Sequence, residues 1–242
     1  SASGYVPKTL RLSAGSPLLT AGRRSELTVV LEKPVPNRPQ WSAEQLRTPL
    51  FSGDTSRPVV YLTFDDGLEA RATADILQSL GVKASFCLPG YVVADDPALV
   101  KYLLDRGEAI CNHTYHHYNP TTLDDATLTD EVTSTEALIA AAGGSAKPFF
   151  RPAEGAYNQH TLDLVAGLGY RNIIWNVDPR DWACEVDVNG LIARVADNVR
   201  WGSIVVMHSF GCVTNAALPG IVSALRARGY SFETFNQLPS SK

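Results

Sequence analysis

Short apolar runs alternate with longer amphipathic segments from residue 58 to the C-terminus, and this alternation is the clearest structural signal in the chain. Each apolar run has the length of a buried strand, and each amphipathic segment is long enough for a helix. Strands are predicted at residues 59–63, 84–88, 109–112, 148–151, 172–176, 204–208 and 231–235. Strands that are joined in sequence by helices form a largely parallel sheet. The pattern therefore predicts a barrel-like α/β fold.

Glycines mark the ends of the predicted helices. Helical segments cover residues 68–80, 97–106, 124–142 and 215–228, and each is followed by a glycine: Gly81, Gly107, Gly143 and Gly229. Glycine readily adopts the left-handed conformation with which many helices end, so these positions support the helix boundaries.

Residues 1–57 show a different pattern. One strand is predicted at residues 27–32, and prolines at positions 34, 36, 39 and 49 interrupt the segment that follows. We therefore expect two parts, an N-terminal extension over residues 1–57 that packs on the barrel and a main domain over residues 58–242.

Composition narrows the functional class. Of the 242 residues 45% are hydrophobic and 19% are charged, as in ordinary globular proteins. The net charge of −4 and the absence of Lys and Arg clusters interleaved with aromatic residues argue against a nucleic-acid partner. No stretch approaches the roughly 18 to 20 apolar residues of a membrane span. The chain starts at Ser1 without an initiator Met or a signal peptide, so we expect a trimmed mature form. We also expect the protein to be a monomer.

Two adjacent carboxylates provide the first chemical signal. Asp65 and Asp66 follow an apolar run and precede Gly67, where ionised carboxylates require a cation or hydrogen bonds. His113 and His117 are four residues apart, and a helical turn would place both imidazoles on one face. Together with one of the aspartates they would complete a three-ligand metal site. This set predicts a metal-assisted hydrolase, although a solvated Asp-Asp-Gly turn and a surface histidine pair are alternatives for each motif alone.

Polar residues follow five of the predicted strands, namely at Asp65-Asp66, residues 113–117, Arg151, residues 178–182 and His208. The carboxyl ends of parallel strands share one face, where sites in α/β folds are built. His208 by itself would more often be a hydrogen-bonded core histidine. The joint occurrence of all five segments favours a single active site.

In their order these five segments resemble the motifs of the polysaccharide deacetylase family, which is the NodB-homology domain or carbohydrate esterase family 4. The motifs are Thr63-Phe64-Asp65-Asp66-Gly67, His113-Thr114-x-x-His117, Arg151-Pro152-x-x-Gly155, Asp178-x-x-Asp181-Trp182 and Met207-His208. The resemblance covers roughly residues 58–238. It implies a distorted (β/α) barrel of about seven parallel strands, which makes residues 58–242 the catalytic domain.

The resemblance also implies a role for each motif residue. It makes Asp66, His113 and His117 the ligands of one divalent metal ion, Asp65 a general base held by Arg151, and His208 a general acid oriented by Asp181. Two histidines and one carboxylate suit Zn²⁺, while Co²⁺, Mn²⁺ and Ni²⁺ occupy similar sites. Substrate-binding roles fall to the backbone N–H of Glu154, the side chain of Trp182 and Met207. Glu154 stands where the family usually has an aromatic residue, which leaves the substrate preference open.

The expected function is a secreted or cell-envelope enzyme that removes N-acetyl groups from N-acetylglucosamine polymers, namely chitin, chitooligosaccharides or peptidoglycan. An acetylxylan esterase with the same site is the alternative, and a non-catalytic carbohydrate-binding protein is a further one. The cysteines leave the redox state open: Cys184 and Cys212 either form a disulfide or stay reduced, and Cys87 and Cys111 either pair or remain buried thiols.

Overall fold

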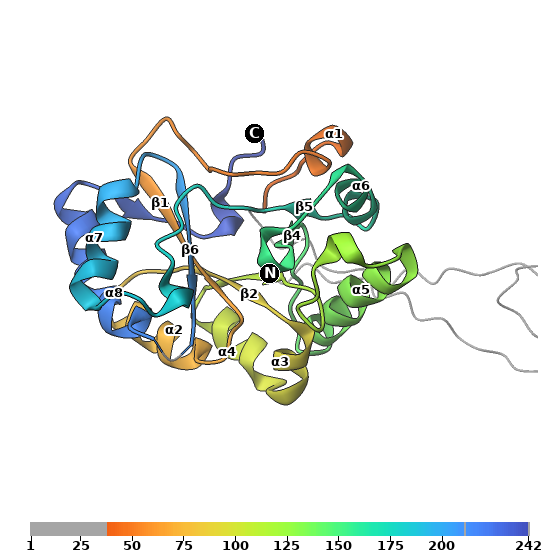
Figure 1. Cartoon of the computed structure of the whole chain (residues 1–242), viewed down its shortest axis with the longest axis horizontal. Coiled ribbons are helices and arrows are strands. Elements are labelled where there is room, and N and C mark those ends of the chain that lie inside the picture. The colour runs from red at the N-terminus through yellow and green to blue at the C-terminus, as the bar shows by residue number, and fades with distance from the viewer. Residues whose placement is uncertain (1–37, 211, 242) are drawn as a thin grey trace, which may run out of the picture. The chain divides into compact units, whose positions relative to one another are not determined.

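The structure, a computed structural model, describes residues 38–210 and 212–241. Within them a seven-stranded parallel sheet forms the centre of the molecule (Figure 1). The strands are β1 (Val59–Asp65), β2 (Ser85–Leu88), β3 (Ala109–Asn112), β4 (Phe149–Phe150), β5 (Arg171–Asn172), β6 (Ser203–His208) and β7 (Ser231–Phe232). Their order is β5-β4-β3-β2-β1-β6, with β7 beside β1. All seven predicted strands are confirmed, although β4, β5 and β7 are shorter than predicted.

The sheet curls until its two ends meet. Beyond β5 the chain reaches Val177, which forms a parallel bridge with Val205 of β6. The N–H of Val177 donates to the Ile204 carbonyl oxygen at 3.2 Å, and the N–H of Val206 donates to the Val177 carbonyl oxygen at 3.0 Å. Because only this short bridge closes the ring, the barrel is irregular on that side. The predicted distorted (β/α) barrel is confirmed.

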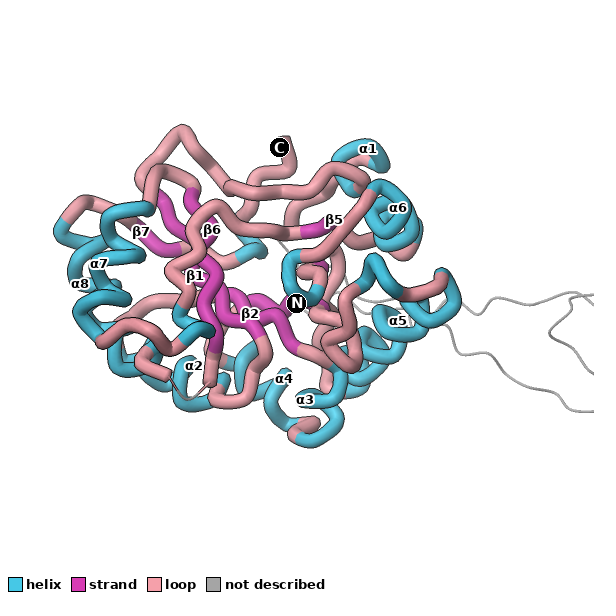
Figure 2. Tube along the Cα trace, in the orientation of Figure 1, coloured by secondary structure: helices cyan, strands magenta, loops and turns pink. Residues whose placement is uncertain are grey.

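Helices surround the strands (Figure 2). They are α2 (Ala70–Ser79), α3 (Gly90–Asp95), α4 (Ala98–Asp105), α5 (Asp125–Ala141), α6 (Gln159–Gly167), α7 (Val188–Asn198) and α8 (Thr214–Ala227). The four predicted helices are confirmed as α2, α4, α5 and α8, and each is followed by its glycine at positive φ. The helices α3, α6 and α7 were not predicted. No helix in the described part of the chain is long and apolar enough to cross a membrane.

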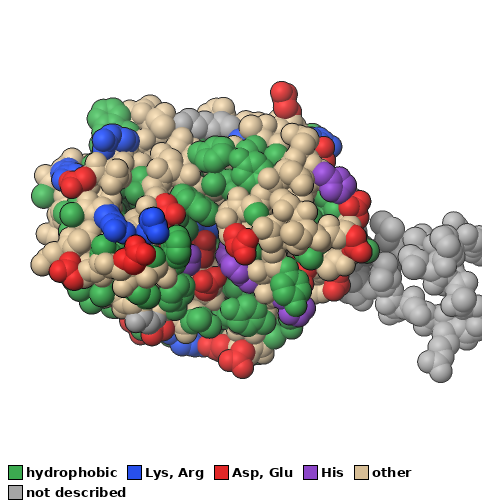
Figure 3. All heavy atoms as spheres, in the orientation of Figure 1, with side chains coloured by type: hydrophobic (Ala, Val, Ile, Leu, Met, Phe, Trp, Pro, Cys, Tyr) green, Lys and Arg blue, Asp and Glu red, His purple; other side chains and the backbone are tan. Residues whose placement is uncertain are grey.

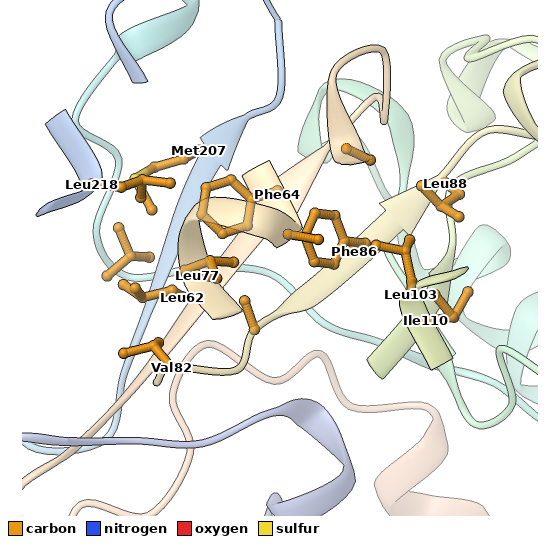
Figure 4. Close-up of a cluster of buried hydrophobic side chains, with 14 of the residues drawn as sticks. Leu62, Phe64, Leu77, Val82, Phe86, Leu88, Leu103, Ile110, Met207 and Leu218 are labelled. Carbon is orange, nitrogen blue, oxygen red and sulfur yellow. The ribbon is translucent and has the colours of Figure 1, made fainter. Parts of the chain in front are cut away.

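Alternation along β1 determines which side chains face the helices and which face the barrel interior. Leu62 and Phe64 belong to the hydrophobic layer between the sheet and the helices (Figure 4). Tyr61 belongs to a second cluster inside the barrel. Asp65 is four residues beyond Tyr61 and therefore points to the interior side, at the carboxyl end of the strand. The packing of the apolar residues of β1 thus places the Asp65 carboxylate at the open end of the barrel.

Part of the predicted N-terminal extension is described. Helix α1 (Ala43–Leu46) is capped by Ser42, and Leu50 forms a parallel bridge with Ile173. The Trp41 ring meets the Phe149 ring edge-on, with centroids 6.0 Å apart. The segment from residue 38 to residue 57 therefore packs on the barrel. The predicted strand at residues 27–32 lies outside the described residues, and the boundary at residue 57 stays a prediction.

Candidate active site

A cavity of about 390 Å³ opens at the carboxyl ends of the central strands. Figure 3 shows it as a hollow in which acidic and histidine side chains lie deep, with hydrophobic side chains around them. Its lining residues are Asp65, Asp66, His113, His117, Glu154, Gly155, Trp175, Asp178, Trp182, Val206, His208 and Phe210. The cavity brings together residues from all five predicted motifs, because parallel strands end on the same face.

Asp65 lies at the bottom of the cavity and is paired with a buried guanidinium. Arg151 Nη1 donates to Asp65 Oδ1 at 2.7 Å and to Thr63 Oγ1 at 2.8 Å. Arg151 is fully buried, and Asp65 is 3% exposed. Burial alone would raise the pKa of Asp65, but the charge of Arg151, together with the imidazoles of His113 and His208, holds this pKa below its ordinary value. Asp65 is therefore ionised at neutral pH and can accept a proton.

Asp66, His113 and His117 form a cluster whose ligand atoms all lie within 4.8 Å of one another. Asp66 Oδ1 is 3.8 Å from His113 Nε2 and 3.6 Å from His117 Nε2. Ligand atoms around a tetrahedral zinc with bonds of ~2.0–2.1 Å are about 3.4 Å apart. The spacing of the cluster therefore fits a divalent ion, and its two nitrogens and one oxygen are donors that zinc accepts.

His113 is oriented for this purpose by its other ring nitrogen. Nδ1 lies 2.7 Å from the carbonyl oxygen of Arg151. A carbonyl oxygen only accepts, so Nδ1 carries the proton and Nε2 presents its lone pair to the cluster. Burial lowers the pKa of His113, which keeps the ring neutral.

The two imidazoles do not come together on a helical turn, and that expectation is wrong. Residues 113–118 form an irregular loop after β3. Thr114 and His117 have φ values of 64° and 61°, in the left-handed region. This path brings the ring centroids of His113 and His117 to 4.8 Å in an edge-on arrangement. The ligand spacing therefore depends on a backbone conformation that the sequence interval alone does not determine.

His208 ends β6, the strand next to β1, and is paired with a buried aspartate. His208 Nδ1 lies 2.9 Å from Asp181 Oδ1, while Asp181 Oδ2 accepts from the His208 N–H and from Thr214 Oγ1, each at 2.7 Å. Burial alone would lower the pKa of His208. The hydrogen bond to Asp181 and the charges of Asp65 and Asp66 raise this pKa above its ordinary value. His208 is thus suited to carry a proton into the cavity.

The three predicted substrate-binding residues have different positions. Glu154 lines the cavity, its φ is 59°, and its carboxylate accepts from Asn119 Nδ2 at 2.9 Å. Trp182 also lines the cavity and is 47% exposed. Met207 does not: its side chain is fully buried in the core between the sheet and the helices (Figure 4). Its neighbour His208 faces the cavity, and adjacent strand residues point to opposite sides, so a role for the Met207 side chain in substrate binding is wrong.

Sequence reasoning gave no role to five residues of the lining, Gly155, Trp175, Asp178, Val206 and Phe210. The alternation of side chains along an extended chain could have identified Trp175. Ile173, two residues earlier, belongs to the cluster inside the barrel, and Trp175 packs against the same cluster. A Cβ on Gly155 would lie 2.6 Å from the Trp175 ring, so only glycine fits beside this wall.

Cys184 and Cys212 form a disulfide, with Cα atoms 5.5 Å apart. Cys184 follows the turn that carries Asp181, and Cys212 lies in the loop after His208. The disulfide therefore links the two loops next to the paired residues Asp181 and His208. Cys87 and Cys111 are buried free thiols.

Comparison with known proteins gives consistent matches. The family model described as polysaccharide deacetylase matches residues 52–173. The chain is 29% identical over 198 residues to the peptidoglycan-N-acetylmuramic acid deacetylase PdaA of Bacillus subtilis, covering 79% of this chain and 75% of that protein. It is 33% identical over 197 residues to a chitooligosaccharide deacetylase of Rhizobium leguminosarum bv. trifolii, covering 74% and 90%.

The same fold also occurs in a protein described as a pseudoenzyme. The barrel superposes with a TM-score of 0.73 on a protein from Bacillus anthracis described as a CE4 family pseudoenzyme, at 26% identity, covering 79% of this chain and 69% of that one. A shared fold therefore does not by itself establish activity, which depends on the side chains in the cavity.

Proposed function

The chain belongs to the polysaccharide deacetylase family, and from this membership we propose that it is a metal-dependent hydrolase that removes N-acetyl groups from N-acetylglucosamine polymers. The observation that carries the proposal is the convergence of three groups on one cavity: an ionised carboxylate at Asp65, a proton-carrying imidazole at His208, and the ligand cluster of Asp66 with two histidines. Amide hydrolysis needs a base for water, an acid for the leaving nitrogen and an electrophile for the carbonyl.

Asp65 is the base in this proposal. It accepts a proton from the water that attacks the acetyl carbonyl carbon, while the Arg151 guanidinium keeps the carboxylate in position. A divalent ion held by Asp66, His113 and His117 would act as a Lewis acid and make water a stronger nucleophile near neutral pH. The oxyanion that develops on the acetyl oxygen receives a hydrogen bond from the backbone N–H of Glu154.

His208 completes the reaction as the acid. It donates its proton to the nitrogen as the carbon–nitrogen bond breaks, which releases acetate and a free amine. Asp181, 1% exposed, holds Nδ1 and leaves Nε2 directed at the cavity. Base and acid therefore hold opposite charges at the same pH, because a guanidinium faces Asp65 and a carboxylate faces His208.

We propose zinc as the ion, since two imidazoles and one carboxylate with remaining open positions are typical of catalytic zinc. Cobalt, manganese and nickel are the alternatives, because they bind similar donor sets. Reconstitution of metal-stripped protein with each ion separately, followed by acetate release, ranks them.

The charge of the cavity favours a neutral polysaccharide such as chitin or its oligosaccharides. Glu154 and Asp178 line the cavity in addition to Asp65 and Asp66, and none of the described lining residues is Lys or Arg. A carboxylate on the substrate, such as that of muramic acid, would meet the negative charges of Glu154 and Asp178, beside which the described lining offers no Lys or Arg. Trp175 and Trp182 supply apolar surface for a sugar face.

The disulfide favours a location outside the cytosol, because such bridges persist in oxidising compartments. A secreted or cell-envelope protein would also meet peptidoglycan or chitin directly. Fractionation of the native host, with antibody detection of the protein, tests this part.

The experiment that tests the function measures acetate release from three substrates in parallel: N-acetylglucosamine oligomers, peptidoglycan and acetylated xylan. We expect the highest kcat/KM on the neutral oligomers and a lower value on peptidoglycan. The Glu154→Gln variant removes one negative charge and keeps an acceptor for Asn119. It should therefore reduce the difference in kcat/KM between the neutral oligomers and peptidoglycan. Release from xylan alone would replace the proposal by the esterase alternative, and release from none would favour a binding role.

A further inference from the structure

A buried carboxylate outside the five motifs holds the loop that carries the two histidine ligands. Glu131 lies on α5, and its side chain is 5% exposed. Its Oε2 accepts from the backbone N–H groups of Tyr115 and His116, each at 2.8 Å. Its Oε1 lies 2.6 Å from His116 Nδ1. All three contacts fall between His113 and His117, the two ligand residues of this loop.

The loop needs such support because its own conformation is unfavourable. Thr114 and His117 occupy the left-handed region, which non-glycine residues adopt only where the surroundings enforce it. The segment has no regular secondary structure, so the N–H groups of Tyr115 and His116 need acceptors from elsewhere. Glu131 supplies both through one carboxylate oxygen.

The carbonyl oxygens of the loop accept hydrogen bonds from a different element, the start of α3. The N–H of Gly90 donates to the Thr114 carbonyl oxygen at 2.9 Å, and the N–H of Tyr91 donates to that of Tyr115 at 3.1 Å. These bonds come from the start of α3 and leave the N–H groups to Glu131. The loop is thus held between two helices, with Glu131 as the charged contact.

We propose that Glu131 is a positioning residue that sets the spacing of His113 and His117 before the metal binds. The inference rests on the proposed function only in taking the cluster as the metal site. Without Glu131 the loop also samples conformations in which the two imidazoles are too far apart to bind one ion. Only part of the protein then has the conformation that binds metal, which weakens the apparent metal affinity. Loss of partners behind the ligands typically lowers metal affinity about 10–100-fold.

Helix α5 offers a matched control. Glu136 is also a buried glutamate on this helix, 9% exposed, and it accepts from Ser145 Oγ at 2.6 Å and from the Tyr170 hydroxyl at 2.7 Å. None of its partners, which also include the Ala146 N–H, belongs to the histidine loop. Glu136→Gln should therefore lower stability to a degree comparable with Glu131→Gln while leaving metal affinity as in the wild type.

The test is a zinc titration of the metal-free full chain against a chelating dye, for the wild type, Glu131→Gln, Glu136→Gln and His116→Ala. We expect the zinc Kd of Glu131→Gln to rise about 10–100-fold. His116→Ala, which keeps both backbone contacts of Glu131, should show a smaller rise, and Glu136→Gln none. Circular dichroism before titration confirms that each variant is folded, and acetate release at saturating zinc should return Glu131→Gln close to the wild-type kcat.

An unchanged zinc Kd in Glu131→Gln would overturn the proposal, and so would an equal loss in Glu131→Gln and Glu136→Gln. A persistent loss of kcat at saturating zinc would also overturn it, because the role would then extend beyond ligand spacing. Wild-type protein that binds zinc but releases no acetate would refute the proposed function, while the comparison of zinc Kd values would still decide the role of Glu131.

Discussion

Replacing Arg151 by methionine tests whether the buried pair with Asp65 determines the state of the proposed base. Arg151 is fully buried and Asp65 is 3% exposed, with 2.7 Å between Nη1 and Oδ1. Removal of one partner from a buried ion pair leaves an uncompensated charge and costs about 3–5 kcal/mol. Arg151→Met should therefore lower the free energy of unfolding by about this amount and abolish acetate release, because the pKa of Asp65 rises once the positive charge is gone.

Part of that cost reflects other lost contacts, since Arg151 also donates to Thr63 Oγ1 and to the Ile173 carbonyl oxygen. A double-mutant cycle with Asp65→Asn separates the pair from these contacts. Because the double variant buries no charge at either position, it should be more stable than Arg151→Met, with a coupling energy of about 2–3 kcal/mol.

The assay is urea unfolding followed by circular dichroism at pH 7 with chelator present, so that bound metal does not contribute. The folded-state pKa of Asp65 is lowered, so its contribution is present above its unfolded pKa and is lost as pH falls through the folded value. The acid-side loss of stability should accordingly be smaller in Arg151→Met. If the losses of unfolding free energy in Arg151→Met and Asp65→Asn add up to that of the double variant within about 0.5 kcal/mol, the two residues are not coupled and the reasoning is refuted.

Three further predictions concern other parts of the molecule. Asp181→Asn should lower the pKa of His208 and move the basic limb of the pH profile of kcat/KM to lower pH; an unmoved limb would contradict the assignment of His208 as acid. Burial raises the pKa of Glu108 from 4.5 to about 7, so over this range the folded state holds a proton that the unfolded chain has released. The free energy of unfolding should therefore fall by about 3 kcal/mol as the pH rises from 4.5 to about 7. Glu108→Gln should remove that dependence in urea unfolding across the same range. Replacing Cys184 and Cys212 by serine opens a loop of 28 residues and should lower unfolding free energy by about 3–4 kcal/mol, whereas unchanged stability would show that the bridge does not constrain the chain.

Much of the fold was predictable because local pattern and global topology agree. The apolar runs and the terminal glycines, such as Gly81 and Gly107, mark elements whose boundaries depend on nearby residues. Helix α3 was missed because its six residues are held by contacts from elsewhere, such as the bond from Gly90 to the Thr114 carbonyl oxygen. The predicted strand at residues 172–176 was too long because the chain leaves β4 beyond Asn172 and turns to meet β6.

The site was predictable to the extent that strand ends share a face. That rule brings Asp65, His113 and His208 into one cavity without any knowledge of loop geometry. It does not provide the conformation of the histidine loop, since the carboxylate that holds it comes from α5, which lies beyond the motif in sequence. Met207 was misassigned because its motif neighbour faces the cavity, although alternation along β6 places Met207 in the core.

We propose that Asp66, His113 and His117 hold an ion that the chemistry at Asp65 requires. The most direct measurement is acetate release from N-acetylglucosamine oligomers by metal-stripped protein, before and after addition of one equivalent of Zn²⁺, with Asp65→Asn as the parallel variant. We predict that zinc restores release in the wild type, and that Asp65→Asn binds zinc without turnover. Release that persists after complete metal removal, or full turnover by Asp65→Asn, would contradict the account.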